Sequence, residues 1–124
     1  MVTINELIAA KMPDEAEIFS SSLEIFISEA MALAGFDGKV EGDLSDIEKS
    51  LIADMAAESL VMPSLSHYKK SIKKAEGEDA GSVEYFDDKL EWLKEIKEIL
   101  KESIRVKWDK ISWFGSIGVP MLLV

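Results

Sequence analysis

One segment, residues 44–62, constrains the fold most, because its apolar side chains cover nearly the whole circumference of a helix. A helix at the protein surface needs a single apolar stripe, whereas a helix of this kind must pack against neighbours on several sides. Only Ser50, Asp54 and Glu58 form a polar strip. The apolar residues are Ile47, Leu51, Ile52, Met55, Ala56, Ala57, Leu60, Val61 and Met62. We therefore expect this segment to form the central helix of a mainly all-α fold.

Both ends of the central helix are marked in the sequence. Ser45 and Glu48 have the spacing of a capping box, in which each side chain bonds the backbone N–H of the other residue. Pro63 lacks an N–H donor and disfavours helical geometry at Met62. The sequence therefore predicts a helix that begins after Ser45 and ends at Met62.

Two helices are expected before the central one. A second capping-box pair, Thr3 and Glu6, predicts a short helix to about residue 11. Pro13 suits the first position of another helix, which the apolar pattern extends to residue 34. Gly35 is then placed to adopt the left-handed conformation that commonly ends a helix. Together with the last helix, these segments predict a small bundle of three to four helices.

Residues 63–86 interrupt this pattern and predict an exposed excursion from the bundle. Segment 64–68 is rich in turn formers, and segment 76–81 combines acidic residues with glycine. Residues 82–86 alternate polar and apolar side chains, which is typical of a short strand and predicts a β-hairpin. The excursion also carries a basic cluster, Lys69, Lys70, Lys73 and Lys74, on an otherwise acidic chain. An amphipathic helix over 87–106 is expected to follow.

The C-terminal segment, residues 108–124, is apolar and predicts a docking arm. It is too short for a membrane span and is interrupted by Gly115, Gly118 and Pro120. Glycine and proline suit an extended segment better than a core helix, so we expect the arm to pack on another polypeptide. We accordingly divide the chain into a helical domain, 1–107, and the arm, 108–124. The candidate docking residues are Trp113, Phe114, Ile117, Val119, Pro120, Met121, Leu122, Leu123 and Val124.

The composition excludes several functional classes. A chain of 124 residues with 48% hydrophobic and 31% charged residues is long enough for one modest core and too apolar for disorder. Its net charge of -10 argues against binding nucleic acid by neutralising phosphates, which needs an excess of lysine and arginine. There are no cysteines, which excludes disulfides and thiol nucleophiles. The opening residues lack the pattern of a signal peptide, so none is expected.

Catalytic patterns are scarce, and we expect no enzyme activity and no cofactor. His67 is the single histidine, Ser20–Ser22 lacks the G-x-S-x-G pattern, and no glycine-rich phosphate loop occurs. Residues Asp37–Glu48 match an EF-hand calcium loop at positions one, five, six and twelve. Lys39 stands at position three, where an oxygen ligand belongs. An acidic turn ahead of a capped helix explains the same residues, and calcium binding remains a lesser alternative.

The order of elements from residue 60 to 108 resembles the head–tail connector, or adaptor, proteins of tailed bacteriophages. These are small helical proteins with an excursion between two helices and a projecting C-terminal segment. The matching elements are Leu60-Val61-Met62-Pro63, Lys70-Ser71-Ile72-Lys73, the acidic glycine turn, Ser82-Val83-Glu84-Tyr85, and the helix end Leu100-Lys101-Glu102-Ser103-Ile104-Arg105-Val106-Lys107-Trp108.

The resemblance implies a structural virion protein. Such adaptors form a closed ring beneath the portal protein, extend the DNA channel and dock the next neck or tail protein. DNA would pass the acidic lumen without sequence-specific binding, and no membrane is involved. The C-terminal residues would engage the portal, while Lys69, Lys70, Lys73, Lys74, Val83 and Tyr85 would contact a neighbouring subunit or the next ring. The expected location is the head–tail junction of the virion, and the host cytoplasm during assembly.

A different class of protein fits the same sequence. An all-helical cytoplasmic interaction module, present as a dimer, would also need helices with more than one apolar side. Oligomeric state separates the two hypotheses, because the connector predicts a large closed ring or assembly on the portal alone.

Overall fold

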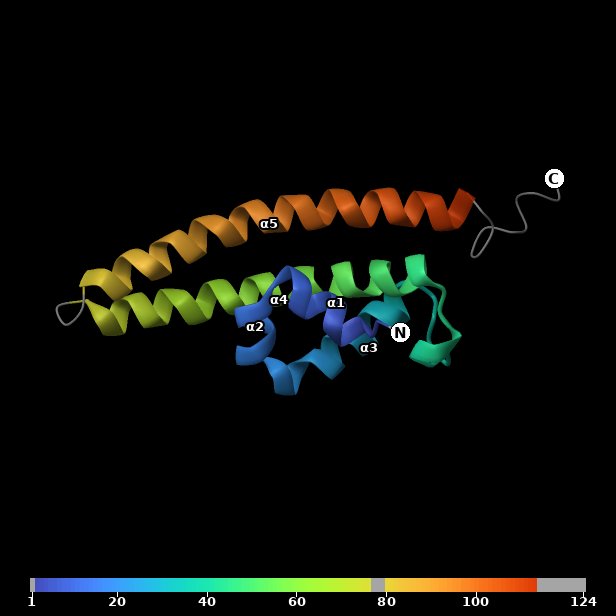
Figure 1. The fold of residues 1–124 in the computed structure, drawn as a ribbon, viewed down its shortest axis with the longest axis horizontal. Coiled ribbons are helices and arrows are strands. Elements are labelled where there is room, and N and C mark those ends of the chain that lie inside the picture. Colours follow the sequence, from blue (N-terminus) through green and yellow to red (C-terminus); the bar gives the residue numbers. More distant parts are fainter. Residues whose placement is uncertain (1, 77–79, 114–124) are drawn as a thin grey trace.

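The computed structural model describes residues 2–76 and 80–113, which form a fold of helices and short 3₁₀ turns (Figure 1). Over these residues the structure contains no β-strand, so the all-α prediction is confirmed in that range. The helices are α1 (Ile4–Lys11), α2 (Pro13–Ile18), α3 (Leu23–Leu33), α4 (Asp46–Ala75) and α5 (Ala80–Trp113), with 3₁₀ turns at Ser20–Ser22 and Glu41–Asp43. None of these helices is both long and apolar enough to cross a membrane.

Helices α4 and α5 form an antiparallel hairpin that runs the length of the molecule (Figure 1). They contain 30 and 34 residues, which at 1.5 Å per residue corresponds to about 45 and 51 Å. Helices α1, α2 and α3 pack against α4. The end of α5 and the start of α4 therefore lie together at one end of the hairpin, opposite the connection between the two helices.

Helix α4 is the central helix, as the sequence predicts. It contacts α1, α2, α3 and α5, and its fully buried apolar residues are Leu51, Ile52, Ala53, Ala56, Ala57, Leu60 and Val61. Two members of the segment differ from expectation. Met62 is 63% exposed, and Asp54, which we placed in a polar surface strip, is fully buried.

The predicted helix caps are confirmed. The Thr3 hydroxyl accepts a hydrogen bond from the Glu6 N–H at 3.1 Å, and the Glu6 carboxylate accepts one from the Thr3 N–H at 3.0 Å. Ser45 and Glu48 form the same reciprocal pair at 3.3 and 2.8 Å. Gly35 has a φ of +82°, and the N–H of the next residue, Phe36, donates to the carbonyl of Met31 at 2.7 Å. This is the Schellman arrangement that ends a helix.

The predicted helix end at Pro63 is wrong. Helix α4 continues through Pro63 to Ala75, so residues 63–75 belong to a helix and not to an exposed excursion. An interior proline costs about 3 kcal/mol through its lost hydrogen bond and its ring. Tertiary packing beyond the proline offsets this cost, since Tyr68 is 2% exposed and its ring stacks on Phe86 of α5 at 5.7 Å.

The predicted β-hairpin is also wrong, because residues 82–86 lie in α5, which begins at Ala80 and not at residue 87. The alternation that we assigned to a strand is the first turn of a helical pattern. Val83, Phe86 and Leu90 are half-buried and Leu93 is buried, at the three- and four-residue steps of a helix. A five-residue window is too short to separate the two periods.

The predicted helix over 13–34 is interrupted. Helix α2 ends at Ile18, a 3₁₀ turn covers Ser20–Ser22, and α3 begins at Leu23. Three consecutive serines explain the break, because serine side chains compete with the backbone for hydrogen bonds and disfavour helix interiors.

Replacing Pro63 by alanine is expected to stabilise the protein. Alanine restores an N–H donor toward the Ser59 carbonyl and removes the proline ring, so the free energy of unfolding should rise by about 1–3 kcal/mol. Urea unfolding followed by circular dichroism measures the change, with Ser66→Ala on the same helix as the control. A loss of stability on Pro63→Ala would show that the proline is needed for the packing of α4.

The boundary that we placed between residues 107 and 108 falls within α5, which continues through Trp108 to Trp113. Trp108 packs against the core as a partly buried side chain. Residues 114–124, which hold most of the predicted docking arm, lie outside the described residues.

Candidate functional site

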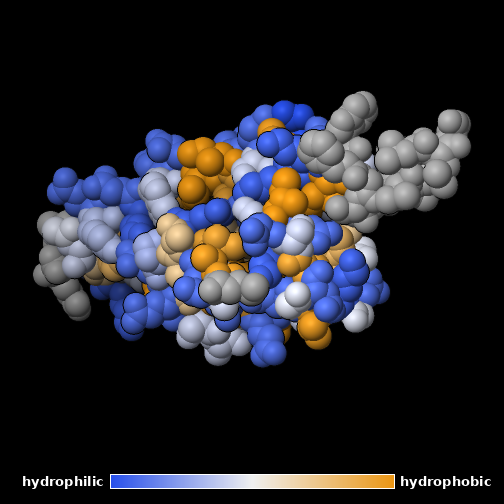
Figure 2. Space-filling view, turned by 45° about the vertical axis from the view of Figure 1, so that its right-hand side comes forward, coloured by the Kyte–Doolittle hydropathy of each residue, from blue (hydrophilic) through white to orange (hydrophobic). Residues whose placement is uncertain are grey.

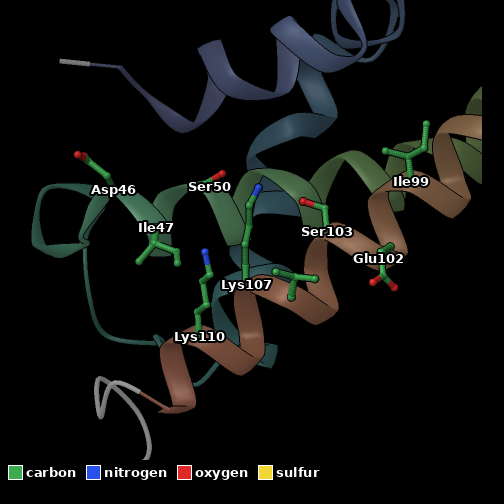
Figure 3. Close-up of a pocket in the computed structure, with 9 residues that line it drawn as sticks. Asp46, Ile47, Ser50, Ile99, Glu102, Ser103, Lys107 and Lys110 are labelled. Carbon is green, nitrogen blue, oxygen red and sulfur yellow. The ribbon is translucent and has the colours of Figure 1, made fainter.

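An open groove lies between the first turns of α4 and the last turns of α5 (Figure 3). Its volume is about 580 Å³. Ile99 is 61% exposed and Val106 is 37% exposed, and Ile47 is half-buried, so apolar surface faces solvent here. We call this site the α4–α5 groove. Its lining residues are Asp46, Ile47, Ser50, Ile99, Glu102, Ser103, Val106, Lys107 and Lys110.

Beside the groove lies a fully buried carboxylate, Asp54 of α4. The Ser103 hydroxyl and the Lys107 ammonium each donate to Asp54 Oδ2 at 2.6 Å. Lys11 Nζ lies 3.2 Å from Asp54 Oδ1 as an ion pair, since Oδ1 accepts no hydrogen bond with suitable geometry. These four residues, the Asp54 cluster, join α1, α4 and α5.

The Asp54 cluster has the composition of a catalytic site but the geometry of a structural one. Ser103 and Lys107 are four residues apart on one face of α5, the spacing of a serine–lysine pair. Both side chains donate to the carboxylate, however, and within the described residues no hydrogen bond joins the Lys107 nitrogen to the Ser103 hydroxyl. A buried charge needs such partners to offset its lost hydration. The arrangement therefore gives the buried charge of Asp54 two lysine partners and one hydroxyl donor.

A second buried carboxylate, Glu15 of α2, joins α2, α4 and α5. Glu15 is fully buried, and its Oε2 accepts a hydrogen bond from the Tyr68 hydroxyl at 2.5 Å and one from the Lys89 ammonium at 2.9 Å. Lys89 also pairs with Asp14 at 2.9 Å and lies 4.7 Å from the centroid of the Trp92 ring. We call Glu15, Tyr68 and Lys89 the Glu15 cluster.

The pKa values of Tyr68 and Lys89 are both raised. Burial raises the pKa of the Tyr68 hydroxyl above its usual range, and the hydrogen bond to Glu15 and the charge of Glu15 raise it further. Burial lowers the pKa of Lys89, but its hydrogen bonds to Asp14 and Glu15 outweigh that effect, so the net shift is upward.

Stability is therefore expected to fall at alkaline pH. Both groups hold their protons more tightly in the folded chain than in the unfolded one. Their contribution to the free energy of unfolding is therefore complete below the pKa of the unfolded chain, which is near 10 for tyrosine, and it declines as the pH rises above that value. One extra proton lost on unfolding gives a slope of about 1.4 kcal/mol per pH unit. Urea unfolding measured at a series of pH values above neutral should show this slope in the free energy of unfolding. The slope should be smaller in Tyr68→Phe. Equal slopes in both proteins would contradict the assignment to Tyr68.

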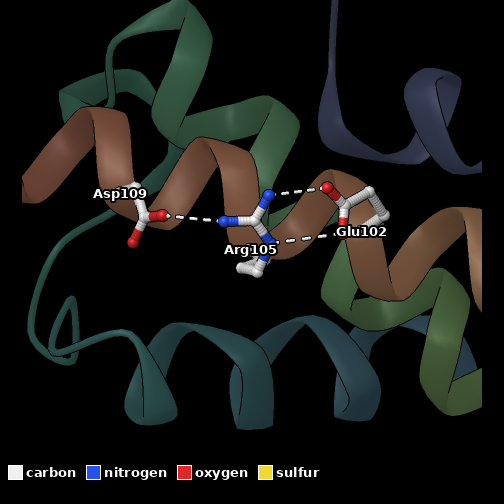
Figure 4. Close-up of polar contacts among 3 residues, drawn as sticks. All are labelled: Glu102, Arg105 and Asp109. Carbon is white, nitrogen blue, oxygen red and sulfur yellow. Dashed lines mark hydrogen bonds and ion pairs between the residues drawn. The ribbon is translucent and has the colours of Figure 1, made fainter.

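An exposed ion network borders the groove on α5 (Figure 4). Arg105 Nη2 and Nε donate to the two carboxylate oxygens of Glu102 at 2.6 and 3.2 Å, and Arg105 Nη1 donates to Asp109 at 3.2 Å. Hydrogen bonds from Arg105 lower the pKa of the Glu102 carboxyl. All three residues are well exposed, so the network fixes charge at the rim of the groove and adds little stability.

The predicted subunit contacts lie near the connection between α4 and α5. Lys69, Lys70, Lys73 and Lys74 are exposed on the last turns of α4. None of them forms an ion pair with another residue of the described ranges. On α5, Val83 is half-buried and Tyr85 is 51% exposed. The structure therefore places the six residues on two helices at one end of the hairpin.

Of the predicted docking residues, Trp113 is the last residue of α5. The others lie outside the described residues: Phe114, Ile117, Val119, Pro120, Met121, Leu122, Leu123 and Val124. The α4–α5 groove was not predicted, although it lies beside the point where this segment begins.

The calcium alternative gains no support from the loop. In residues 2–76 and 80–113 no three or more histidine, aspartate or glutamate side chains are grouped so that they could hold a metal ion. Two carboxylates of the loop already have backbone partners. The Glu48 carboxylate accepts a hydrogen bond from the Ser45 N–H, and the Glu41 carboxylate accepts one from the Ile4 N–H at 3.3 Å. His67, which we expected in a turn, is exposed on α4 and contacts the Phe19 ring edge-on at 6.0 Å.

Comparison with known proteins identifies no relative: no protein-family model matches the chain, and no curated protein or solved structure matches it. The function must therefore be inferred from the chain's own residues and geometry.

Proposed function

We propose that the protein is a structural subunit of a phage head–tail connector and that the end of its helical hairpin docks on the portal protein. The α4–α5 groove is the observation that carries this proposal. It exposes Ile99 and Val106 at the end where α5 leads into the apolar segment 114–124. Exposed apolar surface near the end of α5, followed in the sequence by an apolar segment, favours a docking surface for another polypeptide.

The shape and charge of the molecule support a connecting role. The hairpin is elongated, because each of its two helices is about 45 Å or longer by its residue count. A compact bundle with the same number of residues would be shorter. Figure 2 shows apolar patches exposed between hydrophilic side chains on the face that it presents. The net charge of -10 would let DNA move through a ring lumen without strong attachment.

Within this proposal the protein has three kinds of partner. Copies of the chain form a closed ring, the portal binds the groove end, and the next neck or tail protein binds another face. No catalytic step is required, and the two fully buried carboxylates, Asp54 and Glu15, are assigned structural roles. The location would be the head–tail junction of the virion after assembly in the host cytoplasm.

Electron microscopy of the purified chain, alone and mixed with the portal protein of the same phage, tests the proposal. We expect rings, or density on the portal. The double variant Ile99→Asp, Val106→Asp should weaken portal binding by at least about tenfold, because it places charge in an apolar contact. Val40→Asp, at a loop residue that is 67% exposed, is the matched control. A stable dimer that ignores the portal would favour the helical interaction module.

A further inference from the structure

A second apolar surface lies on α3, on the side away from α4. Ile25 is 59% exposed and Leu33 is 76% exposed, and they are eight residues apart on one helical face. Glu29 is exposed between them at four-residue steps, and Glu24 is exposed one residue before Ile25 at the edge of this face. Neither carboxylate forms an ion pair with a described residue. We call these four residues the acidic α3 face.

A surface of opposite charge lies on the second half of α4. Met62 is 63% exposed, and it lines a shallow groove of about 320 Å³ with Leu65, Ser66, Lys69, Lys70 and Lys73. We call these residues the basic α4 face. The lysines have no carboxylate partner among the described residues, although acidic residues outnumber basic ones in the chain by 24 to 14.

The two faces are opposite in charge and similar in length. Each combines exposed apolar side chains with charged ones, with glutamates on α3 and lysines on α4. Ile25 to Leu33 spans about 12 Å and Met62 to Lys73 about 17 Å, at 1.5 Å per residue. Opposite charges on the two faces favour their pairing and suppress pairing of like faces.

The faces cannot meet within one molecule. Helix α3 packs on α4 through its other side, where Leu23 and Ala30 are buried. Its acidic face therefore points away from α4 of the same chain. A second copy is the partner that supplies the matching surface.

We propose that the acidic α3 face of one copy packs on the basic α4 face of the next. Because two different surfaces meet, the contact is heterologous, and repetition generates a ring if the rotation closes. This inference rests on the proposed connector function, to which it adds the contact between subunits. The lysines that we expected at a subunit boundary thereby gain a specific partner.

Cysteine cross-linking tests the contact, since the chain has no native cysteine. A mixture of Leu33→Cys and Met62→Cys chains, oxidised at low salt, should form the mixed disulfide at least about tenfold faster than Leu33→Cys with Val40→Cys. Adding Lys69→Glu and Lys73→Glu to the Met62→Cys chain should reduce the rate to that of the control pair. Adding Glu24→Lys and Glu29→Lys to the Leu33→Cys chain should then restore it.

Mass spectrometry of the mixed disulfide gives the rates. Equal rates for the test and control pairs both with and without the portal protein, or a rate insensitive to both charge reversals, would overturn the contact. The connector function is tested separately by portal binding of the unmodified chain. Portal binding with equal cross-linking rates would overturn this contact alone, whereas fast cross-linking without portal binding would support the contact and reject the portal-docking role.

Discussion

Replacing Asp54 by alanine is expected to lower the free energy of unfolding by about 3 kcal/mol at neutral pH. The substitution removes the hydrogen-bond acceptor of Ser103 and Lys107 and the ion-pair partner of Lys11, and it leaves a space that the carboxylate filled. Removing one partner of a buried ion pair typically costs 3–5 kcal/mol. We expect the lower end of that range, because the side chains of Lys11 and Lys107 are 26% and 23% exposed and can regain water contacts.

Urea unfolding of wild-type and variant chains measures this loss. Asp54→Asn keeps the shape of the side chain and an acceptor for Ser103, so it should lose less than Asp54→Ala. Asp109→Asn is the matched control. It also removes an aspartate charge that pairs with a basic residue of α5, Arg105, but the Asp109 side chain is 67% exposed. A loss in Asp54→Ala no larger than in Asp109→Asn would show that the cluster does not hold α1, α4 and α5 together.

Local backbone chemistry was the part of the fold most accessible from the sequence. The Thr3–Glu6 and Ser45–Glu48 pairs and the Gly35 cap depend on residues within five positions of one another. Their geometry follows from side chains that bond the adjacent backbone, whatever the rest of the chain does. The burial of α4 was predictable for a related reason, since its apolar residues cover more than one side of a helix.

Pro63 shows why local rules failed in the second half of the chain. The proline is unfavourable in a helix, and the segment after it has few apolar residues, so local preference indicates an end at Met62. The helix is held by contacts with residues remote in sequence. Tyr68 bonds Glu15 of α2 and stacks on Phe86 of α5, and neither partner is visible in the window around the proline.

The candidate site was missed for the same reason. Asp54 interrupts an otherwise apolar segment, which was a signal that it could be buried, and Ser103 and Lys107 share a helical face four residues apart. The sequence did not show that Asp54 contacts Ser103 and Lys107, because the hairpin register of α4 and α5 was not predicted. The hairpin brings Ser103 and Lys107 to Asp54 across 49 and 53 residues, and the α4–α5 groove follows from the same register.

Replacing Glu15 by alanine is the second substitution with a large expected effect, a loss of about 3 kcal/mol in the free energy of unfolding. It leaves the buried Tyr68 hydroxyl without its acceptor and removes one of the two carboxylates that face Lys89. Lys89 keeps its pair with Asp14, so the charge of the lysine is not left alone. Most of the loss should therefore come from the Tyr68 hydroxyl and from the space left by the side chain.

A double-mutant cycle with Tyr68→Phe separates these contributions. If the hydrogen bond couples the two side chains, the double variant should be more stable than the sum of the single losses predicts, by about 1–3 kcal/mol. Glu17→Ala is the matched control, because Glu17 is exposed on the same helix and should lose no measurable stability. Additive losses in the cycle would mean that Tyr68 and Glu15 stabilise the fold independently, and the contact between α2 and the second half of α4 would then rest on packing alone.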